Sequence, residues 1–324
     1  MAKTDAAQSV PYETIGSITT SRPDLISPDA KIEKLGGDFR WSEGPVWVKK
    51  GGYVLFTDVP QNRIHKFKDG EGITTWMDPA GSPDPSIPGQ STQGGNGLIM
   101  WDDDHIIMPD HGSRALVRVN LDTQDKTVVA DRFEGKRLNS PNDVTKHANG
   151  TLYFTDPPYG LDGREASPAR ELDFNGVFAV SPDGEMTLIE DGLKRPNGII
   201  LSPDQMTLYV ANADPEDAKW LAYPLDKLGK VTGEGQVLLN VTADFATGKQ
   251  GNADGMAVDM DGNIWATGPG GVIIFSPTGE RLGLISTGSK IANVTFGGAD
   301  GSMLYMTSHK FLARVKTNTK GVGF

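Results

Sequence analysis

The stretch RPNGIILSPDQMTLYVAN, residues 195–212, contains the unit that decides the fold. Asn197, a polar residue beside a glycine, opens the unit; an apolar stretch and a turn follow, and a short strand rich in aromatic and β-branched residues ends it at Asn212. Residues of these kinds favour β-strands, and the Ser-Pro-Asp between the two apolar runs favours a turn. The stretch therefore predicts two largely apolar strands joined by a turn.

The same unit recurs six times along the chain. Its openings read WSEGPVW at Glu43, QGGNGLI at Asn96, SPNDVTK at Asn142, RPNGIIL at Asn197, NADGMAV at Asp254 and IANVTFG at Asn293. The answering strands end 14 or 15 residues later, at Asp58, Asp110, Asp156, Asn212, Gly268 and Ser308. Successive openings lie 53, 46, 55, 57 and 39 residues apart, which matches four-stranded blades with variable loops. The sequence predicts an all-β protein, a six-bladed β-propeller.

Length and composition agree with this architecture. The 324 residues include 40 glycines and 21 prolines spread along the chain, and we find none of the long amphipathic helices that a parallel α/β fold needs. Closing the ring requires a strand from outside the repeats, for which Lys31–Leu35 is the candidate. We expect a loose N-terminal arm over residues 1–30, then one propeller domain over residues 31–324. The inserts Pro79–Gln93 and Leu161–Phe174 are expected to form loops over one face of the disc.

Charge and cysteine content narrow the possible partners. The formal net charge is −11, whereas nucleic acids and anionic membranes attract basic surfaces. The absence of cysteine excludes disulfides and thiolate chemistry. No apolar run approaches the roughly 20 residues of a membrane span, and the first 30 residues lack a secretory signal. We expect a soluble monomer or small homo-oligomer that acts on a small molecule, with the compartment left open between cytoplasm and, if a leader was removed, periplasm.

Equivalent positions in a closed ring meet around its axis, which predicts a central metal site. The polar residues expected to converge are Glu43, Asn96, Asn142, Asn197, Asp254 and Asn293. Carboxylate and amide oxygens suit one hard divalent cation, calcium first, with magnesium or manganese next and zinc ranked lower. The answering positions Asp58, Asp110, Asp156 and Asn212 would line the channel at another depth if their side chains also point inward. The simpler alternative is that the Asn-Gly and Asp-Gly pairs only form turns, although Glu43 is no turn former.

Two histidines are candidates for proton transfer or substrate contact. His111 directly follows Asp110, and His309 directly follows Ser308. A histidine near a strand end can instead be a structural hydrogen-bonding group, so both interpretations stay open. The chain contains no Gly-x-Ser-x-Gly elbow, phosphate loop or dinucleotide fingerprint, which removes the usual serine hydrolase and nucleotide-binding classes.

The motifs WSEGPVW, SPNDVTKHANGTLYFTDPPYG, RPNGIILSPDQMTLYVAN and NADGMAVDMDGNIWATG together resemble the gluconolactonase branch of the SMP-30/gluconolactonase/LRE-like family, over roughly residues 31–315. The resemblance implies a six-bladed propeller that hydrolyses lactones with a catalytic divalent metal. It assigns the metal ligands to Glu43, Asn142, Asn197 and Asp254. In the branch similar to the mammalian senescence-marker protein, an arginine two residues before the first asparagine helps to hold the sugar. Here that position is Ser140, so this contact cannot be carried over.

The expected activity is hydrolysis of sugar lactones such as gluconolactone. The cation would polarise the carbonyl, and Asp254 or His111 would act as the base. Asn96, Asn142 and His309 are the expected substrate contacts. Two alternatives remain open: hydrolysis of organophosphates or other esters at the same site, and a non-catalytic scaffold with a structural ion.

Overall fold

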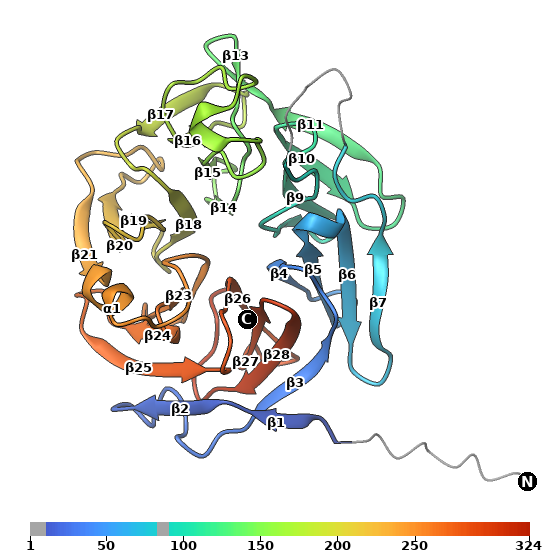
Figure 1. The fold of residues 1–324 in the computed structure, drawn as a ribbon, viewed down its shortest axis with the longest axis vertical. Coiled ribbons are helices and arrows are strands. Elements are labelled where there is room, and N and C mark those ends of the chain that lie inside the picture. Colours follow the sequence, from blue (N-terminus) through green and yellow to red (C-terminus); the bar gives the residue numbers. More distant parts are fainter. Residues whose placement is uncertain (1–10, 83–90) are drawn as a thin grey trace, which may run out of the picture.

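A computed structural model describes residues 11–82 and 91–324 of the chain. Six antiparallel sheets surround a central axis as the blades of a disc, so the predicted six-bladed propeller is confirmed (Figure 1). In each blade the strand that begins at a repeat opening is the innermost, and these innermost strands contact those of neighbouring blades. This topology gathers the six openings at the axis.

The first three blades follow the chain from the innermost strand outward. Blade 1 consists of β4 (Ser42–Val48), β5 (Tyr53–Asp58), β6 (Arg63–Lys68) and β7 (Gly72–Met77). Blade 2 consists of β8 (Ile99–Asp102), β9 (His105–Asp110), β10 (Ala115–Asn120) and β11 (Lys126–Ala130). Blade 3 consists of β14 (Val144–Lys146), β15 (Leu152–Asp156), β16 (Gly176–Val180) and β17 (Met186–Glu190). A small hairpin, β12 (Arg132–Phe133) with β13 (Lys136–Arg137), joins blades 2 and 3.

The last three blades complete the ring. Blade 4 consists of β18 (Pro196–Leu201), β19 (Thr207–Asn212), β20 (Lys219–Pro224) and β21 (Gln236–Asn240). Blade 5 consists of β22 (Met256–Val258), β23 (Ile264–Gly268), β24 (Gly271–Phe275) and β25 (Arg281–Ser286), with β2 (Ser17–Thr20) added outside. Blade 6 consists of β26 (Asn293–Gly297), β27 (Met303–Ser308) and β28 (Phe311–Lys316), with β3 (Ile32–Gly37) and β1 (Glu13–Ile15) added outside.

The N-terminal strands close the ring. β3 pairs with β28 in antiparallel register, with Ile32 opposite Val315, so the predicted closing stretch is confirmed. The expectation of a loose arm is wrong for β1 and β2, which pair with β3 and β25. Both strands satisfy the open backbone groups of a blade edge. Their side chains are mostly exposed, which explains why the sequence shows no apolar pattern there. Residues 1–10 of the predicted arm lie outside the described residues.

The hydrophobic core is divided among the interfaces between blades. Six clusters of buried apolar residues each join two adjacent blades, the last one joining blade 6 to blade 1. At the interface of blades 4 and 5, Trp220 packs against Phe275 with ring centroids 5.2 Å apart. The second strands of the blades are buried on both faces, and β5 and β15 are apolar for most of their length for this reason. Burial of apolar surface between blades therefore stabilises the ring.

Helices are rare in the connections between the strands. In the described residues the helical elements are α1 (Thr242–Ala246) and the 3₁₀ turns Val59–Gln61 and Arg164–Ala166. No described helix is long and apolar enough to cross a membrane. The end of the first predicted insert meets the start of the second, because the Ser91 N–H donates to the Gly160 carbonyl at 2.9 Å. Residues 83–90 of the first insert fall outside the described residues.

Candidate metal and substrate site

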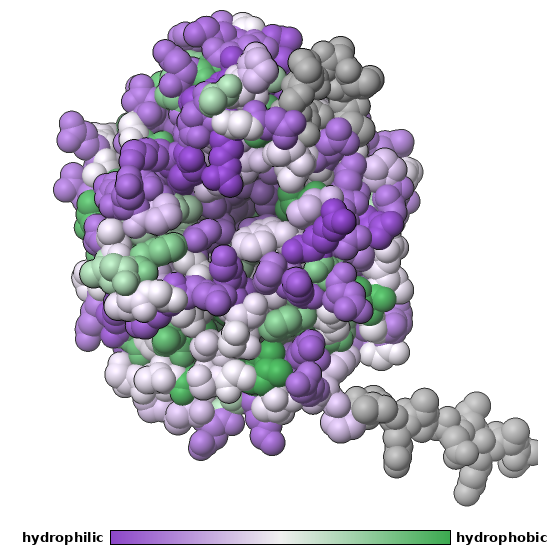
Figure 2. Space-filling model, viewed as in Figure 1, coloured by the Kyte–Doolittle hydropathy of each residue, from purple (hydrophilic) through white to green (hydrophobic). Residues whose placement is uncertain are grey.

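Five of the six opening residues line one cavity at a mouth of the central channel. Glu43 lies on β4 and Asn197 on β18, while the other three directly precede the innermost strands of blades 2, 3 and 5. The cavity has a volume of about 270 Å³, and the opening residues that line it are Glu43, Asn96, Asn142, Asn197 and Asp254. Each of them is less than 10% exposed. A hollow is visible near the centre of this face, with hydrophilic residues prominent around it (Figure 2).

A chain of amide hydrogen bonds joins three of these residues across three blades. The Asn96 Nδ2 group donates to Asn142 Oδ1 at 2.6 Å, and Asn142 Nδ2 donates to Asn197 Oδ1 at 2.5 Å. Each amide therefore orients the next one around the axis. Asn293, the sixth opening residue, does not line the cavity; its amide hydrogen-bonds Glu43 and lies 3.5 Å from Asp143 Oδ2.

Three carboxyl groups are buried together beside this chain of amides. Burial raises the pKa of Glu43 to about 7. Burial, then the nearby charge of Glu43, raises the pKa of Asp143 to about 7. The same causes, with Asp143 added, raise the pKa of Asp254 well above its ordinary value. A bound cation would relieve both the desolvation and the mutual repulsion of these carboxylates.

Asp143 was missed by the sequence reasoning, although a signal was present. Four of the six openings are followed by glycine, whereas Asn142 is followed by Asp143. The Asp143 Oδ1 atom accepts the Val144 N–H at 2.9 Å, and its side chain faces Glu43 and Asn293 from across the axis. An acid at a position that is glycine in four of the six repeats indicates a third carboxylate beside the predicted ring.

The glycines after the openings provide space for the close approach of blades. A Cβ atom built on Gly198 would lie 2.2 Å from the Asp254 carbonyl oxygen, and one on Gly44 would lie 2.1 Å from the Asn96 carbonyl oxygen. A Cβ on Gly97 would meet Asp143 Oδ1 at 2.3 Å. Gly198 lies within strand β18 rather than in a turn. The alternative that these pairs are simple turn formers is therefore wrong for this blade.

The side chains at the answering positions do not point inward, so these residues do not line the cavity at the channel mouth. They are fully buried, and each binds the loop that leads into its own blade's first strand or a neighbouring loop. Asp58 accepts the N–H groups of Arg40 and Trp41, and Asp156 accepts the Asn139 N–H at 2.6 Å. Asn212 Oδ1 accepts the Arg195 N–H at 3.0 Å. These residues position the openings because they satisfy the backbone donors just before them.

His111 lines the cavity and is almost fully buried. Its Nδ1 lies 2.7 Å from Thr92 Oγ1, and its Nε2 lies 3.5 Å from Asn96 Nδ2. Burial lowers the pKa of His111 to about 4, so the ring is neutral at pH 7. A neutral imidazole offers one acceptor nitrogen, and the contact with Asn96 places that side of the ring toward the site.

His309 lies outside the cavity lining. Its ring packs against that of Trp41, with centroids 5.1 Å apart, and Trp41 rather than His309 reaches the cavity. The His309 backbone carbonyl accepts the Ser42 N–H at 2.8 Å. A substrate contact by His309 stays a prediction, and the residue's observed contacts are with the segment that leads to Glu43.

Two residues of the segment after β15 also line the cavity and were given no role by sequence reasoning. Tyr159 hydrogen-bonds Asn197, and its pKa is raised by burial and by the nearby Asp254. Arg164 lies with its guanidinium carbon 5.7 Å from the centre of the Tyr159 ring. Ser140 is fully buried: its hydroxyl donates to the Pro157 carbonyl at 2.6 Å and accepts the Gly160 N–H at 2.8 Å. Ser140 therefore fixes the turn that presents Tyr159.

The oxygen donors fit a hard divalent cation. Glu43 and Asp254 supply two carboxylates, and the amide oxygens of Asn142 and Asn197 each keep a lone pair beyond the one that accepts the neighbouring amide. Across the described ranges, no three His, Cys, Asp or Glu side chains are grouped as metal ligands. A cation here would therefore depend on amide oxygens as well as carboxylates, which calcium accepts and zinc disfavours.

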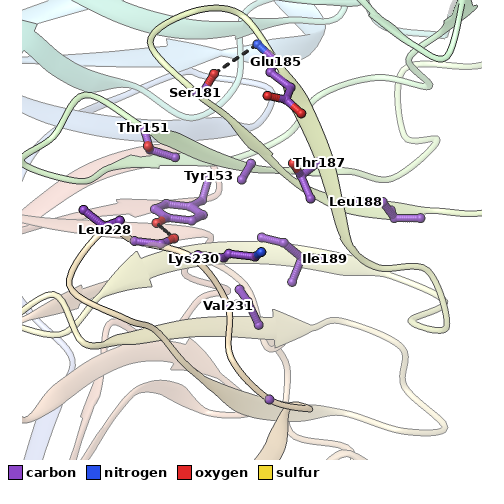
Figure 3. Close-up of a pocket in the computed structure, with 13 residues that line it drawn as sticks. Thr151, Tyr153, Ser181, Glu185, Thr187, Leu188, Ile189, Leu228, Lys230 and Val231 are labelled. Carbon is purple, nitrogen blue, oxygen red and sulfur yellow. Dashed lines mark hydrogen bonds between the residues drawn. The ribbon is translucent and has the colours of Figure 1, made fainter.

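A larger groove lies between blades 3 and 4, away from the channel mouth. It has a volume of about 530 Å³ and is lined by parts of β15 to β17 and by the loop from Leu228 to Gly233 (Figure 3). The Tyr153 hydroxyl already donates to the Gly229 carbonyl, and Glu185 and Lys230 are the charged residues in the described lining. This groove lacks the convergent acids and amides of the channel mouth.

Fold and site together define the class: a six-bladed propeller with carboxylate and amide oxygens at one mouth of its channel. The sequence signature described as the SMP-30/Gluconolactonase/LRE-like region matches residues 41–310, and the chain belongs to this family. It is 42% identical to a gluconolactonase of Zymomonas mobilis subsp. mobilis over 315 residues, which are 95% of this chain and 88% of that protein. The family resemblance expected from the motifs is confirmed.

Two solved structures with similar folds support the same family. One, solved for a candidate gluconolactonase, is 32% identical with a TM-score of 0.81 and covers 96% of this chain and 100% of its own. Another, a gluconolactonase from Xanthomonas campestris described as important in glucose secondary metabolic pathways, is 27% identical with a TM-score of 0.78. It covers 95% of this chain and 97% of its own.

Proposed function

We propose that this protein hydrolyses sugar lactones, with aldonolactones such as gluconolactone as the leading substrates, and that it uses one divalent cation. The observation that carries the proposal is the cavity in which two carboxylates and two amides of separate blades converge. The 42% identity to a gluconolactonase over most of the chain supports the substrate class. Calcium is the favoured cation because the donors are all oxygens and include amides.

Glu43, Asn142, Asn197 and Asp254 are the residues that would hold the cation. When bound, it supplies Lewis-acid polarisation of the lactone carbonyl and stabilises the negative charge that develops on the carbonyl oxygen. The backbone holds these side chains in advance, because the Glu43 carboxylate accepts the Gly44 N–H at 2.9 Å and the amides orient one another. Preorganised polar groups lower the reorganisation needed in the transition state.

Hydrolysis also requires a base for the attacking water. Water adds to the carbonyl carbon, the bond to the ring oxygen breaks, and the ring oxygen leaves as a hydroxyl after receiving a proton. Asp254 is the first candidate base, because its carboxylate lines the cavity and, with one oxygen on the cation, would keep its second oxygen for the water. His111 is the weaker base, since burial lowers the pKa of its ring to about 4. We assign His111 to positioning Asn96, whose Nδ2 lies 3.5 Å from its Nε2.

The test is a proton-release assay across a panel of lactones, run after chelation and again after addition of calcium, magnesium, manganese or zinc. We expect turnover of gluconolactone to be lost on chelation and restored best by calcium. Asp254→Asn and Glu43→Gln are expected to lower kcat by about 100-fold or more, as for the loss of one preorganised charge-stabilising group. Circular dichroism checks that both variants are folded.

The contrary result is equally clear. If both folded variants hydrolyse every lactone in the panel as the wild type does, the cavity is not the site of hydrolysis. Turnover of phosphotriesters but of no lactone would instead favour the organophosphatase alternative.

A further inference from the structure

Arg164 is the cationic side chain among the described residues that line the cavity. It shares this lining with Glu43 and Asp254, while the buried His111 is neutral at pH 7. Within the described parts of the chain, the Arg164 guanidinium has no ion pair and no side-chain hydrogen bond; its contact is with the face of the Tyr159 ring. A guanidinium carries five N–H donors, so these donors are available to a ligand at the mouth.

The backbone of the turn that presents Arg164 is unusual. Gly163 has φ +74° and Arg164 has φ +51°, a conformation that a residue with a side chain rarely adopts. Three backbone hydrogen bonds hold this turn, from the N–H groups of Arg164, Ala166 and Ser167 to carbonyls three residues earlier. The backbone of this turn is therefore held by its own hydrogen bonds.

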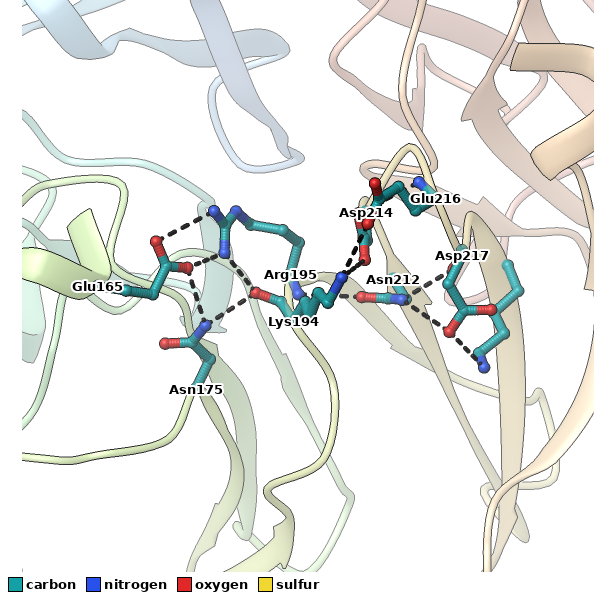
Figure 4. Close-up of polar contacts among 9 residues, drawn as sticks. Glu165, Asn175, Lys194, Arg195, Asn212, Asp214, Glu216 and Asp217 are labelled. Atoms are coloured by element: carbon teal, nitrogen blue, oxygen red, sulfur yellow. Dashed lines mark hydrogen bonds and ion pairs between the residues drawn. The ribbon is translucent and has the colours of Figure 1, made fainter. Parts of the chain in front are cut away.

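An ion pair connects this turn to the strand that carries Asn197. The two Nη groups of Arg195 donate to the two carboxylate oxygens of Glu165, and Asn175 Nδ2 reaches both Glu165 and the Lys194 carbonyl (Figure 4). The backbone of Arg195 is held in turn, because its N–H donates to Asn212 Oδ1 at 3.0 Å. The bidentate geometry distinguishes this pair from a single-contact surface salt bridge, although the Glu165 side chain is exposed.

The depth of the cavity decides which part of a substrate could meet Arg164. Glu43 and Asp254 are 4% and 5% exposed, whereas Arg164 is an exposed residue at the mouth. A lactone whose carbonyl reaches the carboxylates would direct its remote substituent toward Arg164. Hydroxyl oxygens of an aldonolactone and the carboxylate of its product are acceptors that a guanidinium binds, whereas an alkyl lactone offers none there.

We propose that Arg164 is a specificity-determining residue, which binds the oxygen-rich substituent of a lactone, and that the Glu165–Arg195 ion pair is a positioning device that holds it over the cavity. This inference rests on the proposed function. Arg164 acts by direct contact with the substrate, and Glu165 acts through Arg164.

The first experiment compares kcat and KM for D-glucono-δ-lactone and for δ-valerolactone, which lacks hydroxyl groups. For Arg164→Gln we expect the ratio of the two kcat/KM values to fall about tenfold, mainly through the KM for gluconolactone. Glu165→Gln should lower the ratio about threefold, and the double variant should lose no more than Arg164→Gln alone, because the two residues act as a unit. Glu216→Gln is the matched control: Glu216 pairs with Lys194 at 3.0 Å in the same network but does not touch the turn.

The second experiment separates this inference from the proposed function. D-gluconate is titrated into the calcium-loaded wild type and into Arg164→Gln by calorimetry. If no lactone is turned over, the proposed function fails, yet gluconate binding that weakens at least fivefold in Arg164→Gln still supports the inference. A gluconolactone to valerolactone ratio that stays within twofold in folded Arg164→Gln overturns it. If no lactone is turned over, the inference is also overturned when the wild type and Arg164→Gln bind gluconate with equal affinity, or when the wild type does not bind gluconate.

Discussion

Gly198 offers the sharpest test of how the site is held together. It follows Asn197 on β18, and a Cβ atom there would lie 2.2 Å from the Asp254 carbonyl oxygen and 2.9 Å from Gly255 Cα. Real Cβ atoms essentially never approach another atom closer than 3.0 Å. In Gly198→Ala the inner strands of blades 4 and 5 must therefore separate by about 0.8 Å, the difference between the 3.0 Å limit and the 2.2 Å to the Asp254 carbonyl oxygen. The obstacle is backbone, which cannot turn aside as a side chain can.

This separation falls between two proposed cation ligands, Asn197 and Asp254. A displacement near 1 Å in a catalytic arrangement can cost about 100-fold in rate, and overpacking of a tight core costs about 1–3 kcal/mol of stability. Strand propensity alone predicts the opposite, because alanine in place of a strand glycine usually stabilises by about 0.5–1 kcal/mol. We therefore expect Gly198→Ala to be less stable and to lose about 10- to 100-fold in kcat/KM for gluconolactone.

The assay is steady-state kinetics with a calcium titration, combined with urea unfolding of the same preparations. Gly192→Ala is the control, since a Cβ there meets only the flexible end of the Glu190 side chain, at 3.1 Å. If Gly198→Ala keeps more than half of the wild-type kcat/KM and an unchanged calcium affinity, the close approach of blades 4 and 5 does not hold the site, and the reasoning is refuted.

Three further predictions follow from the same structure. Burial raises the pKa values of Glu43 and Asp143 to about 7 in the folded, cation-free protein, above their values in the unfolded chain. The stability that these two groups contribute should therefore be fully present below about pH 4 and be lost as the pH rises through 7. Melting temperatures in chelator should thus fall between pH 5.5 and 8, and calcium should stabilise more at pH 8; a flat profile contradicts this. Asp58→Ala should cost about 1–3 kcal/mol in total, because it removes the buried acceptor of two part-buried backbone N–H groups. Urea unfolding measures the cost, and wild-type stability is the contrary result. Deletion of residues 1–21 removes only the outermost strands β1 and β2, so it should leave a folded, active protein with a lower melting temperature. Deletion of residues 1–38 also removes β3, which closes the ring, and should abolish folding. Equal behaviour of the two truncations in circular dichroism would show that closure by β3 is unnecessary.

The fold could be predicted because each repeat shows a local sequence pattern. The second strands β5, β15 and β19 are buried on both faces, so each reads as a short apolar run at a constant distance from its opening. Turn residues such as Gly184, with φ +83°, mark the outer hairpins in the same way. β1 and β2 escaped prediction because their side chains are mostly exposed and their pairing depends on backbone groups alone.

The site was predicted in part. The convergence of Glu43, Asn197 and Asp254 follows from equivalent places in a closed ring, and the structure places them in one cavity. Whether Asp58 and Asp156 point inward could not be predicted, because a strand position alone does not say whether its side chain faces the axis or the preceding loop; both bind the loop. The roles assigned to the site residues remain proposals.

By itself the sequence determined the class of protein: six blades, their order, the closing strand, and the polar residues at the start of each innermost strand. These features follow from spacing and from the burial pattern of single strands, which are local. Only the tertiary structure decided which side chains meet across the channel, namely the amide chain from Asn96 to Asn197, the third acid Asp143, and the placement of Arg164 over the mouth. Contacts between blades depend on how closely their backbones approach, and that distance cannot be read from the spacing of residues along the chain.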